Sequence, residues 1–349
     1  MAAPAYGTSV TAEVLATLPQ AVDPLALALN ESPFPPLPAV RSALVRCIDA
    51  ANRYPEFLPE QLRRLIADRV GVGEEQVVLG PGASGVAMQV LHAVTQPGDR
   101  IVMSQPTFDG YPIFAKMARL EPVTIELNKY GHHDLPAMAD AATDASVVVL
   151  CRPHNPTGTL EPVSAVEWFL SQVPSDAIVL LDEAYIEFVA SRHRIDGPDL
   201  IRRFPNVVVL RTFSKAYGLA GLRIGYGFAA PDLAGVLWKM QMPFGMSNLS
   251  AAAVAASYDA ETQLAHRVRR IAAERNHLRL RLMAKGVYST DSHANFVYLP
   301  PRDTGRPWRE VFAAASVQVR QYPDGGARVT VGDLPSSLAV LSAVEKSLG

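Results

Sequence analysis

Apolar residues in the middle of the chain fall into short, evenly spaced runs. Between about residue 76 and residue 230 these runs alternate with helix-length segments. They are QVVLG (76–80), RIVMS (100–104), PVTIEL (122–127), SVVVLC (146–151), AIVLLD (177–182), NVVVLR (206–211) and IGYGFA (224–229). This rhythm predicts an α/β fold with a mostly parallel, seven-stranded sheet flanked by helices. Several runs are apolar at nearly every position, as expected for strands that are covered on both faces.

Each predicted strand is followed by a polar or Gly/Pro-rich segment. The clearest of these segments are GPGAS, SQPTF, RPHNPTG, DEAY and RTFSK. In open α/β sheets, ligands bind beyond the carboxyl ends of the strands. We therefore expect these segments to converge on one crevice.

The pattern changes after about residue 248. An Ala-rich stretch around 250–285 predicts one long helix, and a smaller α+β domain follows it. Its predicted strands are 295–299, 317–322 and 328–331, and its predicted helices lie near 307–314 and 335–347. The first 29 residues have weak periodicity and are expected to form an arm. We predict a large domain over 30–248, with 1–29 and 249–349 forming the arm and the small domain.

Length and composition narrow the class of protein. A chain of 349 residues is long enough for two lobes with a deep site between them. A formal net charge of -2 gives no basic excess to attract nucleic acid or anionic lipid, so we expect small-molecule partners. The first residues lack the features of a signal peptide, and no apolar run approaches the roughly 18 residues that span a membrane, so we predict a cytoplasmic protein. Cys47 and Cys151 form neither a disulfide framework nor a zinc motif, and we expect no metal.

The segment Thr212-Phe213-Ser214-Lys215 carries the most specific chemical signal. Lys215 directly follows a strand end, stands beside hydroxyl side chains and is followed eight residues later by Arg223. This arrangement suits an imine-forming amine beside a phosphate site. A solvated surface lysine fits the local pattern equally well.

The remaining motifs decide between these two interpretations. When these motifs are taken together with the lysine segment, the chain resembles the fold-type I pyridoxal phosphate aminotransferases, in the histidinol-phosphate and aromatic aminotransferase subgroup. The resemblance covers nearly the whole chain in the family's order. It rests on the segments Leu29-Asn30-Glu31-Ser32-Pro33-Phe34, Asn52-Arg53-Tyr54-Pro55, Asn155-Pro156-Thr157-Gly158, Asp182-Glu183-Ala184-Tyr185, Thr212 to Tyr226, and Arg328-Val329-Thr330-Val331.

The resemblance implies a pyridoxal 5′-phosphate enzyme with Lys215, Asp182 and Tyr185 as catalytic residues. Lys215 would form a Schiff base with the cofactor and move a proton from the substrate's Cα. Asp182 ends a buried strand, where an unpaired carboxylate is costly, and a protonated pyridine nitrogen would be its partner. A helix-capping role is the alternative for Asp182. Tyr185 and Asn155 would donate hydrogen bonds to the cofactor's phenolic oxygen, with a cis bond before Pro156.

The same resemblance assigns the other cofactor contacts. The phosphate would be held by backbone N–H groups at a helix N-terminus and by side chains after the lysine strand. These residues are Gly82, Ala83, Ser84, Thr212, Ser214 and Arg223. Phe108 occupies the position where the family usually has a Tyr that stacks on the pyridine ring. A phenylalanine can still stack on that ring, but it lacks the tyrosine's hydroxyl group. Tyr54 resembles a residue that reaches the phosphate from a partner subunit, which implies a homodimer with shared sites. An exposed turn tyrosine is the alternative.

On the substrate side, the resemblance assigns Arg328 to the α-carboxylate. Asn155 would lie against the substrate as well. Arg320 resembles the arginine that reaches the substrate phosphate in histidinol-phosphate aminotransferases, and Tyr6 would join it from the arm. The doublet His132-His133 lacks other metal ligands and is interpreted as a solvated turn.

These assignments predict transamination between an amino donor and a 2-oxo acid such as 2-oxoglutarate. The donor is expected to be histidinol phosphate or an aromatic amino acid such as phenylalanine. A pyridoxal phosphate decarboxylase acting on a phosphorylated amino acid is the first alternative, because the sequence does not fix which bond stands perpendicular to the ring. A cofactor-sensing transcription regulator is a remote alternative, since no basic helix-turn-helix precedes residue 30.

Overall fold

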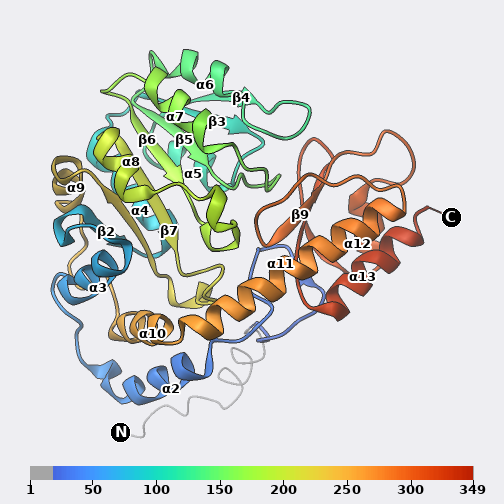
Figure 1. Ribbon diagram of the computed structural model, residues 1–349, viewed down its shortest axis with the longest axis horizontal. Helices are drawn as coiled ribbons and strands as arrows, with labels where there is room; N and C mark the ends of the chain where they lie inside the picture. The colour runs from blue at the N-terminus through green and yellow to red at the C-terminus, as the bar shows by residue number, and fades with distance from the viewer. Residues whose placement is uncertain (1–18, 349) are drawn as a thin grey trace, which may run out of the picture.

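The larger of two lobes is built on a seven-stranded sheet (Figure 1). The computed structural model describes residues 19–348. The strands occur in the order β2-β8-β7-β6-β5-β3-β4, and β8 is the one strand of this sheet that runs antiparallel to its neighbours. They are β2 (Val77–Gly80), β3 (Arg100–Gln105), β4 (Glu121–Glu126), β5 (Val147–Cys151), β6 (Ile178–Asp182), β7 (Val207–Thr212) and β8 (Gly225–Ala229). The predicted α/β fold with a mostly parallel sheet is confirmed.

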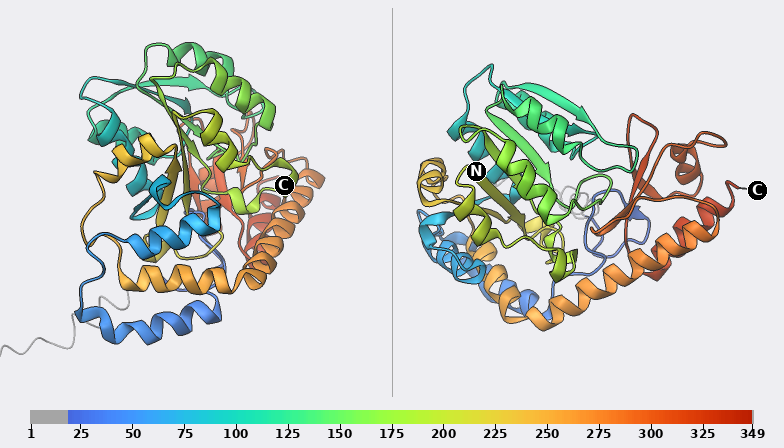
Figure 2. Two further views of the ribbon diagram at one scale, coloured as in Figure 1. Left: turned by 60° about the vertical axis from the view of Figure 1, so that its left-hand side comes forward. Right: turned by 45° about the horizontal axis from the view of Figure 1, so that its top comes forward.

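Helices cover both faces of this sheet (Figure 2). Successive residues of β5 point to opposite faces, so that Val148 and Leu150 join one apolar cluster and Val147 and Val149 join another. One face is covered by α6 (Leu135–Ala142), α7 (Val163–Gln172) and α8 (Gly197–Arg203), and the other by α4 (Gly82–Val94), α5 (Gly110–Met117) and α9 (Pro231–Trp238). Burial on both faces explains why the strands are apolar at nearly every position.

The smaller lobe contains a four-stranded sheet in the order β1-β10-β11-β9. Its strands are β1 (Ala26–Leu27), β10 (Gln318–Gln321), β11 (Ala327–Thr330) and β9 (Phe296–Leu299). Helices α12 (Trp308–Ala314) and α13 (Leu334–Glu345) complete its core. Strand β1 pairs in parallel with β10. The described part of the predicted N-terminal arm therefore contributes a strand to the small lobe.

The Ala-rich stretch forms two helices, and the expectation of one long helix is wrong. Helix α10 (Asn248–Asp259) ends at Ala260, and α11 (Glu261–Ala284) begins directly after it. Helix α10 packs on α2 (Pro38–Cys47) and contributes to the core of the large lobe. Helix α11 runs to the small lobe, where Ile271 and Leu278 enter its core. The break lets two successive helices pack into two different cores. Helix α10 lies C-terminal to the predicted boundary at residue 248, yet it packs against the large lobe.

One further α-helix and five short 3-10 helices complete the described structure. They are α3 (Glu60–Val70) and the 3-10 helices η1 (Ile48–Asn52), η2 (Glu74–Gln76), η3 (Ile186–Phe188), η4 (Ser191–His193) and η5 (Ala220–Leu222). Among residues 19–348, none of the helices combines the length and the apolar character needed to cross a membrane.

Candidate active site

An anion cradle lies where β2 meets α4. Gly82 opens α4 with φ +77°, a conformation that favours glycine. A Cβ on Gly82 would collide with the guanidinium of Arg223, and a Cβ on Gly225 would collide with the backbone of Gly82 and Ala83. The backbone N–H groups of the first helical turn, including Ala83 and Ser84, have no partners within the helix. They point outward with the positive end of the helix dipole.

Side chains from the loop after β7 complete this cradle. The Arg223 Nη1 atom lies 3.5 Å from Ser214 Oγ, and its Nη2 atom donates to Pro81 O at 3.3 Å. The Thr212 hydroxyl donates to Ser214 Oγ at 2.9 Å, which fixes the loop beside the lysine. In the described structure no carboxylate forms an ion pair with Arg223. A guanidinium, a hydroxyl and a helix N-terminus form a donor set that suits a phosphate group.

Lys215 is half-buried and lies where the two lobes meet. Its Nζ atom donates to Leu29 O at 2.9 Å and lies 6.0 Å from the centre of the Tyr185 ring. Burial and the nearby positive charge of Arg328 lower the pKa of Lys215 to about 8. The amine is therefore far more often neutral near physiological pH than an ordinary lysine amine. These surroundings do not fit the alternative of a solvated surface lysine.

Asp182 ends β6 and is buried. Its Oδ2 atom accepts a hydrogen bond from the Tyr111 hydroxyl at 2.7 Å, and its Oδ1 atom accepts from the Ala184 N–H at 3.0 Å. Burial raises the pKa of Asp182, and the hydrogen bond from Tyr111 opposes that rise. No basic side chain of residues 19–348 forms an ion pair with Asp182. A bound cationic group would stabilise the charged carboxylate.

Tyr185 is held by two amide side chains. Its hydroxyl oxygen accepts hydrogen bonds from Asn30 Nδ2 at 2.9 Å and from Asn155 Nδ2 at 3.3 Å. Burial raises the pKa of Tyr185 to about 12, so the phenol keeps its proton at neutral pH. Because both neighbours donate, that proton is available to a third acceptor. The peptide bond before Pro156 is cis, as the resemblance implied.

Arg328 lies on β11 with only 4% of its surface exposed. Its Nη1 atom donates to Asn155 Oδ1 at 2.6 Å and to the Tyr322 hydroxyl at 3.2 Å, and its Nη2 atom donates to Ala28 O at 2.7 Å. Its Nε atom is buried and finds no acceptor among the described residues. A buried guanidinium whose bonded acceptors are all uncharged is suited to bind a carboxylate.

The other predicted site residues have different surroundings. Phe108 packs edge-on against Tyr111, the tyrosine that reaches Asp182, with ring centres 5.8 Å apart. Arg320 forms an ion pair with Asp109, with an Nε–Oδ2 distance of 3.0 Å. Tyr54 is 82% exposed, and within this chain it contacts Phe244 rather than the cradle. Tyr6 lies outside the described residues.

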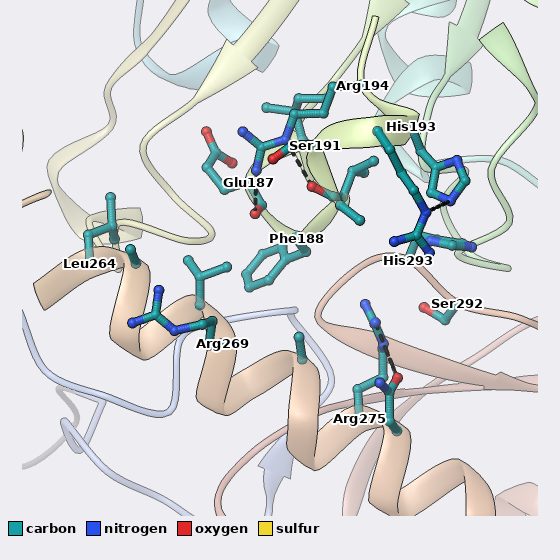
Figure 3. Close-up of a pocket in the computed structure, with 18 of the residues that line it drawn as sticks. Glu187, Phe188, Ser191, His193, Arg194, Leu264, Arg269, Arg275, Ser292 and His293 are labelled. Carbon is teal, nitrogen blue, oxygen red and sulfur yellow. Dashed lines mark hydrogen bonds between the residues drawn. The ribbon is translucent and has the colours of Figure 1, made fainter. Parts of the chain in front are cut away.

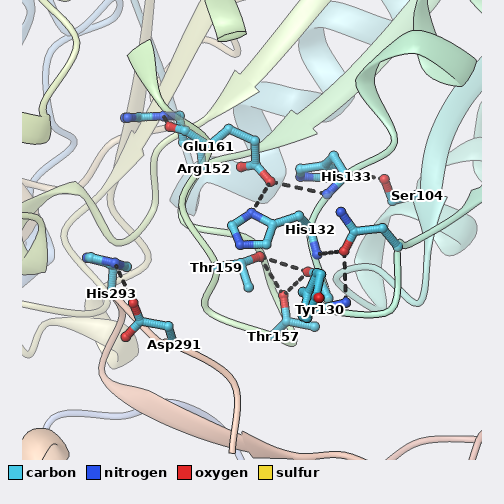
Figure 4. Close-up of polar contacts among 12 residues, drawn as sticks. Ser104, Tyr130, His132, His133, Arg152, Thr157, Thr159, Glu161, Asp291 and His293 are labelled. Atoms are coloured by element: carbon cyan, nitrogen blue, oxygen red, sulfur yellow. Dashed lines mark hydrogen bonds and ion pairs between the residues drawn. The ribbon is translucent and has the colours of Figure 1, made fainter. Parts of the chain in front are cut away.

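Figure 4 shows the histidine doublet beside Thr159 and Glu161. These two residues belong to the loop after β5, which also carries Asn155. His133 is buried and bonds to the Ser104 hydroxyl and, at 2.9 Å, to Cys151 O. His132 faces Glu161 at 3.3 Å. The expectation of a solvated turn is therefore wrong for His133, because the neighbouring strand ends enclose it. Gly131, which directly precedes the doublet, also contacts the loop of Asn155, because its carbonyl oxygen accepts a hydrogen bond from the Thr157 hydroxyl at 2.7 Å.

A separate cavity of about 1160 Å³ lies between α11 and the segment of η3 and η4. Figure 3 shows arginine and histidine side chains around it, including Arg194, Arg269, Arg275 and His293. Among residues 19–348, none of the predicted site residues lines this cavity. The predicted site residues with the contacts described above lie around Lys215 instead.

Four residues near the crevice were missed as site residues. Asn30 belongs to a quoted motif but received no role, although it bonds to Tyr185. Tyr111 follows Phe108 at helical spacing, and that spacing is a signal that could have identified it. Tyr322 contacts Arg328, and Asp109 contacts Arg320. No local pattern marks the last two, because their partners are distant in the sequence or on another strand.

Comparison with known proteins gives a consistent result. Residues 22–331 match the family described as aminotransferase class I and II. An aromatic amino acid aminotransferase from Rhodococcus opacus is 42% identical over 317 residues, which cover 90% of this chain and 88% of that protein. One from Streptomyces coelicolor is 40% identical, covering 92% of this chain and 89% of that protein.

A solved structure extends the similarity to three dimensions. Histidinol-phosphate aminotransferase from Sinorhizobium meliloti, in complex with pyridoxal 5′-phosphate, superposes with a TM-score of 0.84. The two chains are 25% identical, and the match covers 99% of this chain and 98% of that one. With the family match extending over most of the sequence, the chain belongs to the class I and II aminotransferases.

Proposed function

We propose that this aminotransferase uses pyridoxal 5′-phosphate to transfer the amino group of an aromatic amino acid to a 2-oxo acid. One observation carries the proposal: an amine with a lowered pKa, Lys215, lies near Arg328, a buried guanidinium that has no carboxylate partner among residues 19–348. An amino acid needs both groups, because its carboxylate must be held while its Cα proton is moved.

The residues in the crevice fit the cofactor. The glycine-lined cradle with Arg223 and Ser214 suits its phosphate, and buried Asp182 suits a protonated ring nitrogen. Tyr185 has a free proton to donate to the phenolic oxygen. Bound pyridoxal phosphate would supply an electron sink for the charge that develops at the substrate's Cα.

The protein's own groups would then perform the remaining work. Arg328 binds the α-carboxylate and fixes the orientation of Cα. Lys215, once its amine is free, takes the proton from the substrate's Cα and later gives it up again. The same amine thus serves first as a base and then as an acid. A base with a pKa near 8 suits this task, because an ordinary lysine would remain protonated.

Two observations support an aromatic donor over histidinol phosphate. The similar proteins at about 40% identity are named aromatic amino acid aminotransferases. Arg320, the group that would bind a substrate phosphate, is paired with the carboxylate of Asp109, which a distal anion must displace and a neutral ring need not. A neutral aromatic side chain requires no anion-binding group at that end of the crevice.

Steady-state kinetics with 2-oxoglutarate as acceptor would test this function. We expect kcat/KM for phenylalanine to exceed that for histidinol phosphate, because the neutral ring leaves the Arg320–Asp109 pair intact. A higher value for histidinol phosphate would reject the aromatic assignment. Release of carbon dioxide from a phosphorylated amino acid, without an amino product from 2-oxoglutarate, would instead support the decarboxylase alternative.

We further propose that two chains form a homodimer with shared sites. Four side chains near α2 and the segment after α9 are strongly exposed although they are apolar or aromatic. These are Tyr54, Phe57, Met242 and Phe244. The ring of Phe244 contacts both Tyr54 and Phe57, with centres 4.8 Å and 5.1 Å apart. Such a cluster on a water-soluble enzyme favours coverage by another chain, and a second copy would bring Tyr54 to its partner's cradle.

A complementation experiment would test the shared site. Tyr54→Phe removes the phosphate-binding hydroxyl, and we expect about a 3- to 10-fold weaker affinity for the cofactor, since a net hydrogen bond is worth about 0.5–1.5 kcal/mol. When Tyr54→Phe chains exchange subunits with inactive Lys215→Ala chains, one site of each heterodimer combines an intact Lys215 with an intact Tyr54. That site should regain near-normal affinity for the cofactor. Tyr130→Phe, also exposed, is the matched control. A fully active monomer by light scattering would contradict the proposal.

A further inference from the structure

Two arginines lie side by side on one face of the small lobe's sheet. Arg320 on β10 is the direct cross-strand partner of Arg328 on β11. Val319, which precedes Arg320, and Val329, which follows Arg328, contact the core of the small lobe. Since alternate residues of a strand point to opposite faces, both arginines point away from that core. Both reach groups of the large lobe, namely Asn155 for Arg328 and Asp109 for Arg320.

The two arginines differ in depth and in partner. Within residues 19–348, Arg328 is buried and bonds only to uncharged oxygen atoms. The Arg320 side chain is 48% exposed and forms an ion pair with Asp109, whose side chain is 38% exposed. Like charges directly opposite on neighbouring strands destabilise a sheet, and Asp109 offsets the outer charge. An ion pair this exposed contributes little to stability, so a competing anion can open it at small cost.

We propose that Asp109 determines side-chain specificity, because it competes with the distal anion of a substrate for Arg320. A substrate with two acidic groups would place its α-carboxylate on Arg328 and its second anion on Arg320, and Asp109 must then move aside. A substrate with a neutral ring leaves the ion pair closed. One site can thus accept an aromatic donor and still admit a dicarboxylate such as the 2-oxo acid acceptor.

Asp109 lies where such competition is effective. It directly follows Phe108, the residue predicted to stack on the cofactor, and it immediately precedes α5. The hydrogen bond to Asp109 raises the pKa of the Arg320 guanidinium in the closed pair. The arginine also remains charged without that contact, because a guanidinium is not deprotonated in proteins. The inference rests on the proposed function for the identity of the two substrates. Its test measures equilibrium binding and does not depend on turnover.

The experiment compares two inert ligands on the cofactor-loaded enzyme by calorimetry. Glutarate has two carboxylates and no amino group, and 3-phenylpropionate has one carboxylate and a ring. Asp109→Asn should bind glutarate about two- to fivefold more tightly, because the competing pair is lost. It should leave 3-phenylpropionate affinity nearly unchanged. Arg320→Ala should weaken glutarate binding about tenfold or more, since a charge-assisted contact is lost.

The double variant Asp109→Asn/Arg320→Ala separates specificity from general effects. It should bind glutarate as weakly as Arg320→Ala alone, because Asp109 acts only through Arg320. Asp144→Asn is the matched control, since it removes another exposed ion pair, with Arg100 at the opposite end of β3. Equal tightening of both ligands, or a gain that survives without Arg320, would overturn the inference and indicate a mere contact between lobes. Failure of the aromatic assignment would appear only in turnover with phenylalanine.

Discussion

Lys215→Ala is expected to abolish measurable transamination. The variant loses the amine that attaches the cofactor and the base that moves the Cα proton, and general base catalysis alone is worth about 10²–10⁴ in rate. It should nevertheless bind pyridoxal phosphate, because Arg223, Ser214 and the Gly82 turn are unchanged. Stopped-flow assays with phenylalanine, together with the visible absorbance band of the lysine-linked cofactor, measure the two effects separately.

The pH dependence of cofactor attachment adds a second measurement on the native chain. Because burial and Arg328 lower the pKa of Lys215 to about 8, the reactive neutral amine should increase as pH rises through about 8 and then level off. An ordinary lysine would show that rise near its usual pKa of about 10.4. Lys116→Ala, on the exposed side of α5, is the control and should behave like the wild type. Normal turnover by Lys215→Ala would rule out the assigned base.

Asp182→Ala is expected to lower kcat by about 10²–10³ or more. Removing a preorganised charge partner at a reacting centre typically has an effect of that size. Burial raises the pKa of Asp182, so the isolated chain favours its neutral form more than an ordinary aspartate does. A cationic ring nitrogen would reverse this preference, and the carboxylate and the ring would then stabilise each other's charge.

Comparison with Asp182→Asn separates charge from shape. The asparagine can still accept the hydrogen bond from Tyr111, yet it should lose nearly as much activity because it has no negative charge. Asp176→Ala, an exposed change, is the matched control. Single-turnover rates with phenylalanine and melting temperatures should be measured together. An Asp182→Ala enzyme within a few-fold of the wild type would show that this carboxylate does not face the cofactor.

The strands of the large sheet were predictable because their signals are local. A strand buried on both faces requires apolar residues at successive positions, as in Val147 to Leu150, and this pattern is visible in the sequence. The antiparallel direction of β8 was not predictable, because strand direction depends on pairing with β2 and β7. The break at Ala260 was missed for a similar reason. An Ala-rich sequence favours one continuous helix, and only the need to pack on two separate cores ends it there.

The sequence by itself determined which side chains could perform the chemistry. Lys215, Asp182 and Arg328 lie in motifs whose order identifies the family. Asp182 ends β6, Arg328 lies within β11, and Lys215 lies in the loop after β7. Such motifs can be found in the sequence because residue type and spacing are local features of the chain.

Only the tertiary structure decided which groups surround those side chains. The lowered pKa of Lys215 depends on burial and on Arg328, which is 113 residues away in sequence (328 − 215). The burial of His133 and the pairing of Asp109 with Arg320 likewise require segments from different strands or lobes. Electrostatic interactions and burial depend on distance in space, and the sequence pattern contains no direct measure of that distance.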